Sequence, residues 1–144
     1  MTAPLATASS SSRLSNEPGR ALITVRGQHF VTDSPPSLGG PNEAANPAEL
    51  MLSALAGCAT FICECAAREM GIALRAVDVT VAGDFDPRGL CGEPFDPRFQ
   101  ALRVRLALEG PDAAQSEALI QAFKQRCPMY TTLARAAPID VTLA

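Results

Sequence analysis

The fold of this chain is decided by residues 46–63, which read NPAELMLSALAGCATFIC. The stretch begins as a capped helix does. Asn46 is a suitable N-cap, Pro47 suits the first helical position, and Glu49 lies three residues after the cap, as in a capping box. The opening of the stretch therefore predicts a helix that starts at Pro47.

No charged residue follows Glu49 until Glu64, so the first half of this helix is apolar on every face. A helix of that kind is normally buried on every face. The uncharged run is shorter than the roughly 20 residues that a bilayer requires. We therefore expect a long buried central helix over residues 47–70 of a soluble protein, with Cys58 in its middle. Gly57 would let another element approach closely at that point.

The size and charge of the chain limit its class. Its 144 residues suit one domain, which we place at residues 13–144 after a mobile N-terminal tail, residues 1–12. A net charge of −3, with no basic cluster between aromatic residues, argues against a nucleic-acid partner. The N-terminus has no secretory signal. The five cysteines of the chain lack the spacing of a disulfide framework. We expect a cytoplasmic protein that enters no membrane.

Alternating apolar residues predict strands on both sides of the helix. Residues 20–26 and 29–33 predict a hairpin, and the Pro- and Gly-rich residues 34–41 predict an irregular loop. Residues 76–82 and 102–108 also alternate, and they predict a second, longer hairpin.

The C-terminal part predicts two further helices and a strand. Asp112 starts a helix that stops near Cys127, because Pro128 disfavours helical geometry in the residue before it. Pro128 then opens a short helix through Leu133, and residues 139–143 alternate as a last strand. The order β-β-α-β-β-α-α-β indicates an α+β fold with an antiparallel sheet.

Two cysteines, Cys58 and Cys127, are candidates for reactive thiols. Cys58 alone proves little, since a buried thiol usually behaves as a small hydrophobe. Cys127 follows Lys124 and Arg126 and precedes the Pro128 helix, a setting that favours the thiolate. The alternative is that Cys127 only caps a helix, and the residues leave both interpretations open.

The other cysteines and the histidine give weaker signals. Cys63 and Cys65 lie two apart on a helix, so they point to opposite sides and cannot bind one metal or pair with each other. Cys91 lies in a loop, and we interpret it as incidental. His29 lies in a strand and has no partner at zinc-ligand spacing. We therefore expect no metal site.

Three motifs together resemble those of the OsmC/Ohr family. They are PSLGG at residues 36–40, NPAELMLSALAGC at residues 46–58 and RCP at residues 126–128. The sequence DPRGL at residues 86–90 is similar to a branch of the same family. The resemblance runs from about Arg20 to the C-terminus.

The resemblance implies an OsmC-like fold and an intertwined homodimer. Two central helices would pack between sheets from both chains, with the active site at the subunit boundary. The substrates would be organic hydroperoxides, with Cys58 as the peroxidatic thiol and Cys127 as the resolving thiol. A dithiol reductant would reset the disulfide. The implied chemistry uses no metal or other cofactor.

The chain lacks one acidic residue that the family's hydroperoxidases have. Those enzymes place a Glu directly after the helix-start Pro, to hold an Arg that favours the thiolate, and this chain has Ala48 there. Glu49 is roughly opposite Cys58 on the helix, so we interpret it as part of the capping box. The Arg should come from the first hairpin. Arg20 fits best and Arg26 is the other candidate, unless both are simply solvated.

Two functions follow from these observations. The preferred one is a thiol-dependent peroxidase that reduces organic hydroperoxides through a sulfenic acid and disulfide cycle. The alternative is a noncatalytic OsmC-like dimer that binds a small apolar ligand at the subunit interface, lined by Met51, Leu55 and Phe61. The preferred function requires the sulfurs of Cys58 and Cys127 to meet.

Overall fold

The computed structural model describes residues 4–143. The chain divides into two compact units, each described here by itself. The first comprises the chain up to Leu50 together with Pro87–Phe95, and the second comprises Met51–Asp86 together with the chain from Asp96 onward. One domain over residues 13–144 stays a prediction.

The first unit contains an antiparallel sheet in the order β1-β2-β3. Its strands are β1 (Ser11–Leu14), β2 (Arg20–Val25) and β3 (Gln28–Asp33). The turn between β2 and β3 uses positive φ angles at Arg26 and Gly27, of 50° and 77°. Such a turn matches the right-handed twist of two short strands, so the predicted first hairpin is confirmed.

The N-terminal edge of this sheet differs from the prediction. The sequence analysis assigned Ser11 and Ser12 to a tail, whereas both belong to β1, where they pair with Thr24 and Ile23. Strand pairing uses backbone groups, so a polar segment can extend a sheet whose edge is free. Residues 1–3 of the predicted tail lie outside the described residues. The predicted loop 34–41 contains a short 3₁₀ turn, Pro36–Leu38, and a second, Pro87–Cys91, lies in the same unit.

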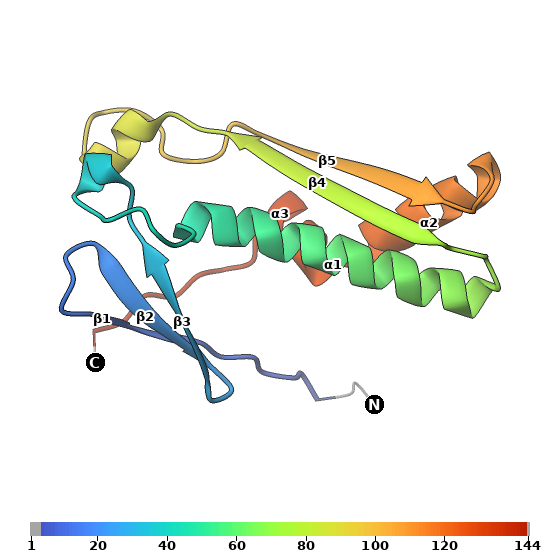
Figure 1. Ribbon diagram of the computed structural model, residues 1–144, viewed down its shortest axis with the longest axis horizontal. Coiled ribbons are helices and arrows are strands. Elements are labelled where there is room, and N and C mark those ends of the chain that lie inside the picture. Colours follow the sequence, from blue (N-terminus) through green and yellow to red (C-terminus); the bar gives the residue numbers. More distant parts are fainter. Residues whose placement is uncertain (1–3, 144) are drawn as a thin grey trace. The chain divides into compact units, whose positions relative to one another are not determined.

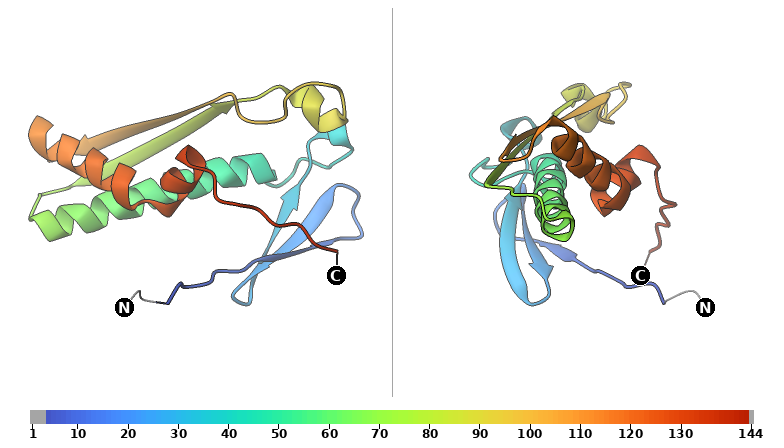
Figure 2. Two further views of the ribbon diagram at one scale, coloured as in Figure 1. Left: turned by 180° about the vertical axis from the view of Figure 1, so that it is seen from behind. Right: turned by 90° about the vertical axis from the view of Figure 1, so that its right-hand side faces the viewer.

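The second unit is built on α1 (Pro47–Met70), whose first turn still belongs to the first unit. The strands β4 (Ala76–Asp84) and β5 (Ala101–Glu109) form the predicted long antiparallel hairpin, which runs along α1 (Figure 1). The helices α2 (Ala113–Arg126) and α3 (Pro128–Ala134) follow, and the end-on view shows them beside α1 (Figure 2). The fold is therefore α+β, as predicted.

The core of the second unit lies between α1, α2 and the inner face of the β4–β5 hairpin. The buried side chains are small on α1 and larger on α2, so the two helices can approach closely. The buried members are Leu55, Ala59, Cys63, Ala66, Ala67, Leu119, Ala122, Phe123 and Cys127.

Leu119 is the residue on which we expect this core to depend most. It is 0 % exposed, and Leu119→Ala should lower the free energy of unfolding by about 2–5 kcal/mol, because it removes buried apolar surface and leaves a cavity. Leu5→Ala is the matched control, since Leu5 is 97 % exposed and its loss should cost less than about 0.5 kcal/mol. Urea unfolding curves measure both. Equal losses would contradict this description of the core.

Only one face of α1 is buried within a single chain. Phe61 on the other face is 70 % exposed, and apart from the neighbouring backbone of α1 itself, no atom of the described residues lies within 4 Å of a Cβ placed on Gly57. The expected close approach at Gly57 is therefore absent within one chain. Burial of the helix on every face stays a prediction that depends on the homodimer.

The predicted last strand is wrong for the single chain. Residues 139–143 form no strand, and the alternating side chains of Ile139, Val141 and Leu143 are exposed. An alternating segment becomes a strand only where another strand offers its backbone groups. Among the described residues, no strand pairs with this segment.

Candidate functional site

The sulfurs of Cys58 and Cys127 lie side by side in the second unit. They are 2.8 Å apart, although the residues are 69 positions apart in the sequence. This distance is longer than the roughly 2.05 Å of a disulfide bond, and both thiols are free. The expectation that the two sulfurs meet is confirmed. Only a small movement of the two side chains is needed to bring the sulfurs to the length of a disulfide bond.

The junction between α2 and α3 positions Cys127. Its backbone N–H donates to the Phe123 carbonyl at 3.0 Å, which ends α2, and its sulfur accepts a hydrogen bond from the Tyr130 N–H at 3.3 Å, which begins α3. Pro128 supplies the first residue of α3. Cys127 is thus fixed by the ends of two helices, and it is fully buried.

The electrostatics around Cys58 favour the neutral thiol. Burial, followed by the hydrogen bond with Cys127, raises the pKa of Cys58 to about 11. A backbone hydrogen bond from Met129 acts in the opposite direction but does not offset them. Within one chain, these surroundings therefore favour the neutral form of the Cys58 thiol at neutral pH.

The hydrogen bonds of the Arg126 side chain go to α1, although the residue lies next to Cys127 in the sequence. The guanidinium donates to the Glu69 carboxylate on α1, with Nη1–Oε2 and Nη2–Oε1 distances of 2.6 and 2.9 Å. The Cys65 thiol also donates to Glu69, at 3.2 Å. This ion pair holds the pKa of Glu69 down at about 2. The side chain of Arg126 turns away because a residue next to a buried cysteine on a helix projects in another direction.

Arg20, the predicted catalytic arginine, is held by two carboxylates in the first unit. Its Nε and Nη2 donate to the two oxygens of Asp33 at 2.7 and 2.8 Å, and Nη2 also donates to Glu43 at 2.9 Å. Asp33 is buried and accepts two more hydrogen bonds, from the N–H groups of Glu43 and Ala44. These contacts, led by Arg20, lower the pKa of Asp33 and keep it ionised.

Asp33 and Glu43 were not predicted from the sequence as partners of Arg20. The pairing of Arg20 with Asp33 had one available signal: the register of the first hairpin places the two residues directly opposite each other. Arg26, the other candidate, lies in the hairpin turn. Glu43 lies in a loop, and no periodicity indicates where a loop residue points.

The assignment of Glu49 to a capping box is confirmed. Its N–H donates to the Asn46 side-chain oxygen, and its carboxylate accepts from the Asn46 N–H, both at 2.9 Å. Because these bonds hold Glu49 at the start of α1, its role is to cap the helix.

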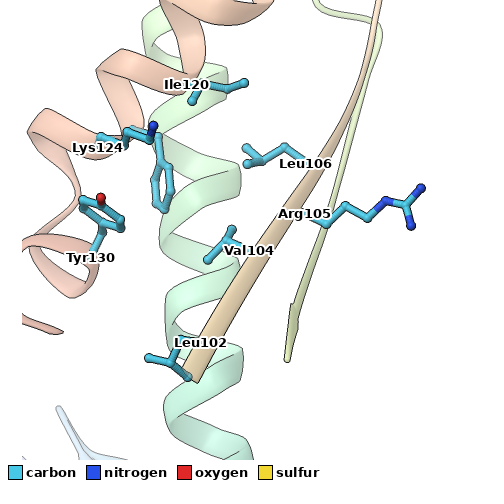
Figure 3. Close-up of a pocket in the computed structure, with 8 residues that line it drawn as sticks. Leu102, Val104, Arg105, Leu106, Ile120, Lys124 and Tyr130 are labelled. Atoms are coloured by element: carbon cyan, nitrogen blue, oxygen red, sulfur yellow. The ribbon is translucent and has the colours of Figure 1, made fainter. Parts of the chain in front are cut away.

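An apolar cavity of about 480 Å³ lies beside the core of the second unit (Figure 3). It is lined by Leu102, Val104, Arg105, Leu106, Ile120, Phe123, Lys124 and Tyr130. In Figure 3 the side chain of Arg105 extends away from the other labelled residues, so Lys124 and the Tyr130 hydroxyl are the polar groups near it. A second cavity, of about 260 Å³, shares Tyr130 and includes Leu55. Neither cavity is lined by Met51 or Phe61.

The three other cysteines are Cys63, Cys65 and Cys91. Cys91 is exposed in the first unit, and Cys63 is buried with its thiol toward the Leu119 carbonyl. His29 shares a hydrogen bond with Thr24 across the first hairpin, as expected of a hairpin residue. Within residues 4–143, no three His, Cys, Asp or Glu side chains are grouped as metal ligands would be.

The family model described as OsmC-like protein matches residues 40–142, which include both cysteines and the central helix. The chain belongs to the OsmC-like protein family. No curated protein matches the sequence.

Solved structures of OsmC-like proteins have the same fold. The OsmC-like protein of Mycoplasma pneumoniae has a TM-score of 0.76 and 17 % identity, over 91 % of this chain and 89 % of that one. An organic hydroperoxide resistance protein of Legionella pneumophila has a TM-score of 0.65 and 22 % identity, over 93 % of each chain. Another, from Elizabethkingia anophelis, has a TM-score of 0.68 and 20 % identity, over 94 % and 92 %.

Membership of this family also explains why α1 has so apolar a composition. By length and composition alone, α1 could cross a membrane. In the OsmC-like fold it is the core helix of a soluble protein, with one face packed against α2 and the β4–β5 hairpin. Cys58, whose sulfur contacts that of Cys127, lies on the same helix.

Proposed function

We propose that this OsmC-like protein is a cytoplasmic, homodimeric thiol peroxidase that reduces organic hydroperoxides. The observation that carries the proposal is the contact of the Cys58 and Cys127 sulfurs at 2.8 Å. Two relatives of the same fold are named organic hydroperoxide resistance proteins, which supports the substrate class.

The reaction would proceed in two steps. The Cys58 thiolate attacks the distal peroxide oxygen, the O–O bond breaks, and a sulfenic acid and an alcohol form. The Cys127 thiol then attacks the sulfenic sulfur, releasing water and forming the disulfide. An external dithiol reduces this disulfide and is itself oxidised.

Exposure supports this division of roles. Cys58 is partly exposed, whereas Cys127 is fully buried behind it. A peroxide can therefore approach Cys58 more readily. The buried Cys127 is protected from the substrate but remains close enough to form the disulfide.

Arg20 is the proposed source of the charge that activates Cys58. Since the thiol's pKa is about 11 within one chain, a nearby guanidinium must lower it for reaction at neutral pH. We expect the peroxide reaction of the wild type to titrate below pH 11. In Arg20→Gln the midpoint should rise by at least about one pH unit, slowing the reaction roughly tenfold at pH 7. Stopped-flow rate constants from pH 5 to 11 measure this shift.

Two variants make the arginine test specific. Arg20→Lys keeps the charge and should retain part of the shift, which separates charge from the loss of the Asp33 contact. Arg26→Gln removes the other candidate arginine of the same hairpin and should leave the profile unchanged. A shift in Arg26→Gln without one in Arg20→Gln would transfer the role to Arg26.

A noncatalytic dimer that binds an apolar ligand is the second candidate. The raised pKa of Cys58 and the 480 Å³ apolar cavity favour it. It would hold if the purified protein carried a bound apolar molecule while its thiols did not react with an alkyl hydroperoxide.

A further inference from the structure

The ion pair between Glu69 and Arg126 has no part in the reaction as described above. It joins the C-terminal end of α1 to the last residue of α2, within the second unit. The two N–H···O contacts, at 2.6 and 2.9 Å, make the ion pair bidentate. A bidentate pair fixes the orientation of the Arg126 guanidinium relative to the Glu69 carboxylate as well as the distance between them. The Cys65 thiol donates to the same carboxylate at 3.2 Å.

The positions along α1 connect this pair with the sulfur contact. Glu69 follows Cys58 by about three helical turns, roughly 16 Å, and lies on nearly the same face of the helix. Arg126 and Cys127 are consecutive residues at the end of α2. The end of α2 is therefore attached to one face of α1 at two points, one formed by the two sulfurs and the other by the ion pair.

Cys127 lies at the junction of two helices, so the position of its sulfur depends on how the end of α2 and the start of α3 are oriented. Cys127 is the last hydrogen-bonded residue of α2 and the cap of α3, and its backbone is extended, with φ −77° and ψ 114°. A small rotation at such a junction would move the Cys127 sulfur by an ångström or more. A second attachment on the neighbouring residue opposes that rotation.

We propose that Glu69 and Arg126 are positioning residues that hold the Cys127 sulfur against Cys58 and so favour formation of their disulfide. The kinetic part of this proposal rests on the proposed peroxidase function, whereas the equilibrium part does not. Half-exposed ion pairs contribute little to stability, so variants of this pair should fold, and the effect should appear in the thiol chemistry.

The first measurement needs no peroxide. The full-length protein is equilibrated in mixtures of reduced and oxidised glutathione, and the fraction of Cys58–Cys127 disulfide is measured by mass spectrometry. In Glu69→Gln and Arg126→Gln the equilibrium constant for the disulfide should fall about tenfold or more, because the effective concentration of the Cys127 thiol at Cys58 is lower when its position is less restrained. The exchanged pair Glu69→Arg with Arg126→Glu should restore most of the loss.

The matched control is Arg68→Gln. Arg68 is the neighbouring arginine on α1, where it pairs with Glu64 at 3.5 Å on the exposed surface. Arg68→Gln removes one positive charge beside Glu69 but leaves the Glu69–Arg126 pair in place, and it should leave the equilibrium unchanged. An equal effect in Arg68→Gln, or no effect in either Gln variant, would overturn the proposal. Failure of the exchanged pair to restore the disulfide would do the same.

The second measurement uses rapid mixing with tert-butyl hydroperoxide. Sulfenic acid should form at Cys58 at the wild-type rate in Glu69→Gln and Arg126→Gln, because neither residue acts in that step. Disulfide formation should slow about tenfold, and more Cys58 should proceed to sulfinic acid. Slower sulfenic acid formation with unchanged disulfide closure would contradict a positioning role. If the wild type forms no sulfenic acid, the peroxidase proposal fails, and the glutathione equilibrium still decides this one.

Discussion

Cys58→Ser should consume alkyl hydroperoxide at least roughly a thousandfold more slowly than the wild type, because a serine hydroxyl at this position is no substitute for a thiolate nucleophile. The loss should be complete at the first step, with no alcohol product above the uncatalysed rate. The measurement is the rate of peroxide loss in the presence of a small dithiol, followed by alcohol detection.

The matched control for this variant is Cys91→Ser. Cys91 is exposed and belongs to the first unit, whereas both sulfurs of the pair belong to the second, so the rate of Cys91→Ser should equal that of the wild type. The peroxidase proposal is abandoned if Cys58→Ser keeps the wild-type rate. If only Cys91→Ser lost activity, the peroxidatic thiol would be Cys91.

Cys127→Ser should complete one turnover and then stop. The first step needs only Cys58, so about one equivalent of alcohol per chain should form, and Cys58 should accumulate as sulfenic acid, trapped by dimedone. Steady-state turnover with a dithiol should fall about a hundredfold, because the sulfenic acid on Cys58 lacks the resolving sulfur that lies 2.8 Å away in the wild type. Single-turnover product analysis and mass spectrometry measure both effects.

The disulfide itself provides the check on this second prediction. Wild-type protein treated with one equivalent of peroxide should yield a peptide pair that joins Cys58 to Cys127, and Cys63→Ser should yield the same pair. A disulfide from Cys58 to another cysteine, or full turnover in Cys127→Ser, would remove Cys127 from the cycle. Cys63 is the stringent control because it is buried in the same core.

Local patterns predicted most of the helices and strands. The capping box at Asn46 and Glu49 marked the start of α1, and Pro128 separated α2 from α3 as expected. Alternation predicted β4 and β5, which pair over their full length. Each of these features depends on residues a few positions apart, so each can be derived from the sequence.

The errors arose where a partner from elsewhere in the chain was needed. Residues 139–143 have the alternation of a strand, but no other strand of the described chain pairs with them. The serines of β1 were assigned to a tail, although the edge of β2 pairs with them. Pairing depends on which backbone is adjacent in three dimensions, and local propensity does not contain that information.

The sequence by itself determined the OsmC-like family, the central helix and the two candidate cysteines, Cys58 and Cys127. The tertiary structure decided which groups those side chains contact. It placed one sulfur against the other across 69 residues, directed Arg126 to Glu69 across 57, and paired Arg20 with two carboxylates, those of Asp33 and Glu43. Helix caps and alternation arise from bonds between near neighbours, whereas ion pairs and thiol contacts depend on how distant elements pack.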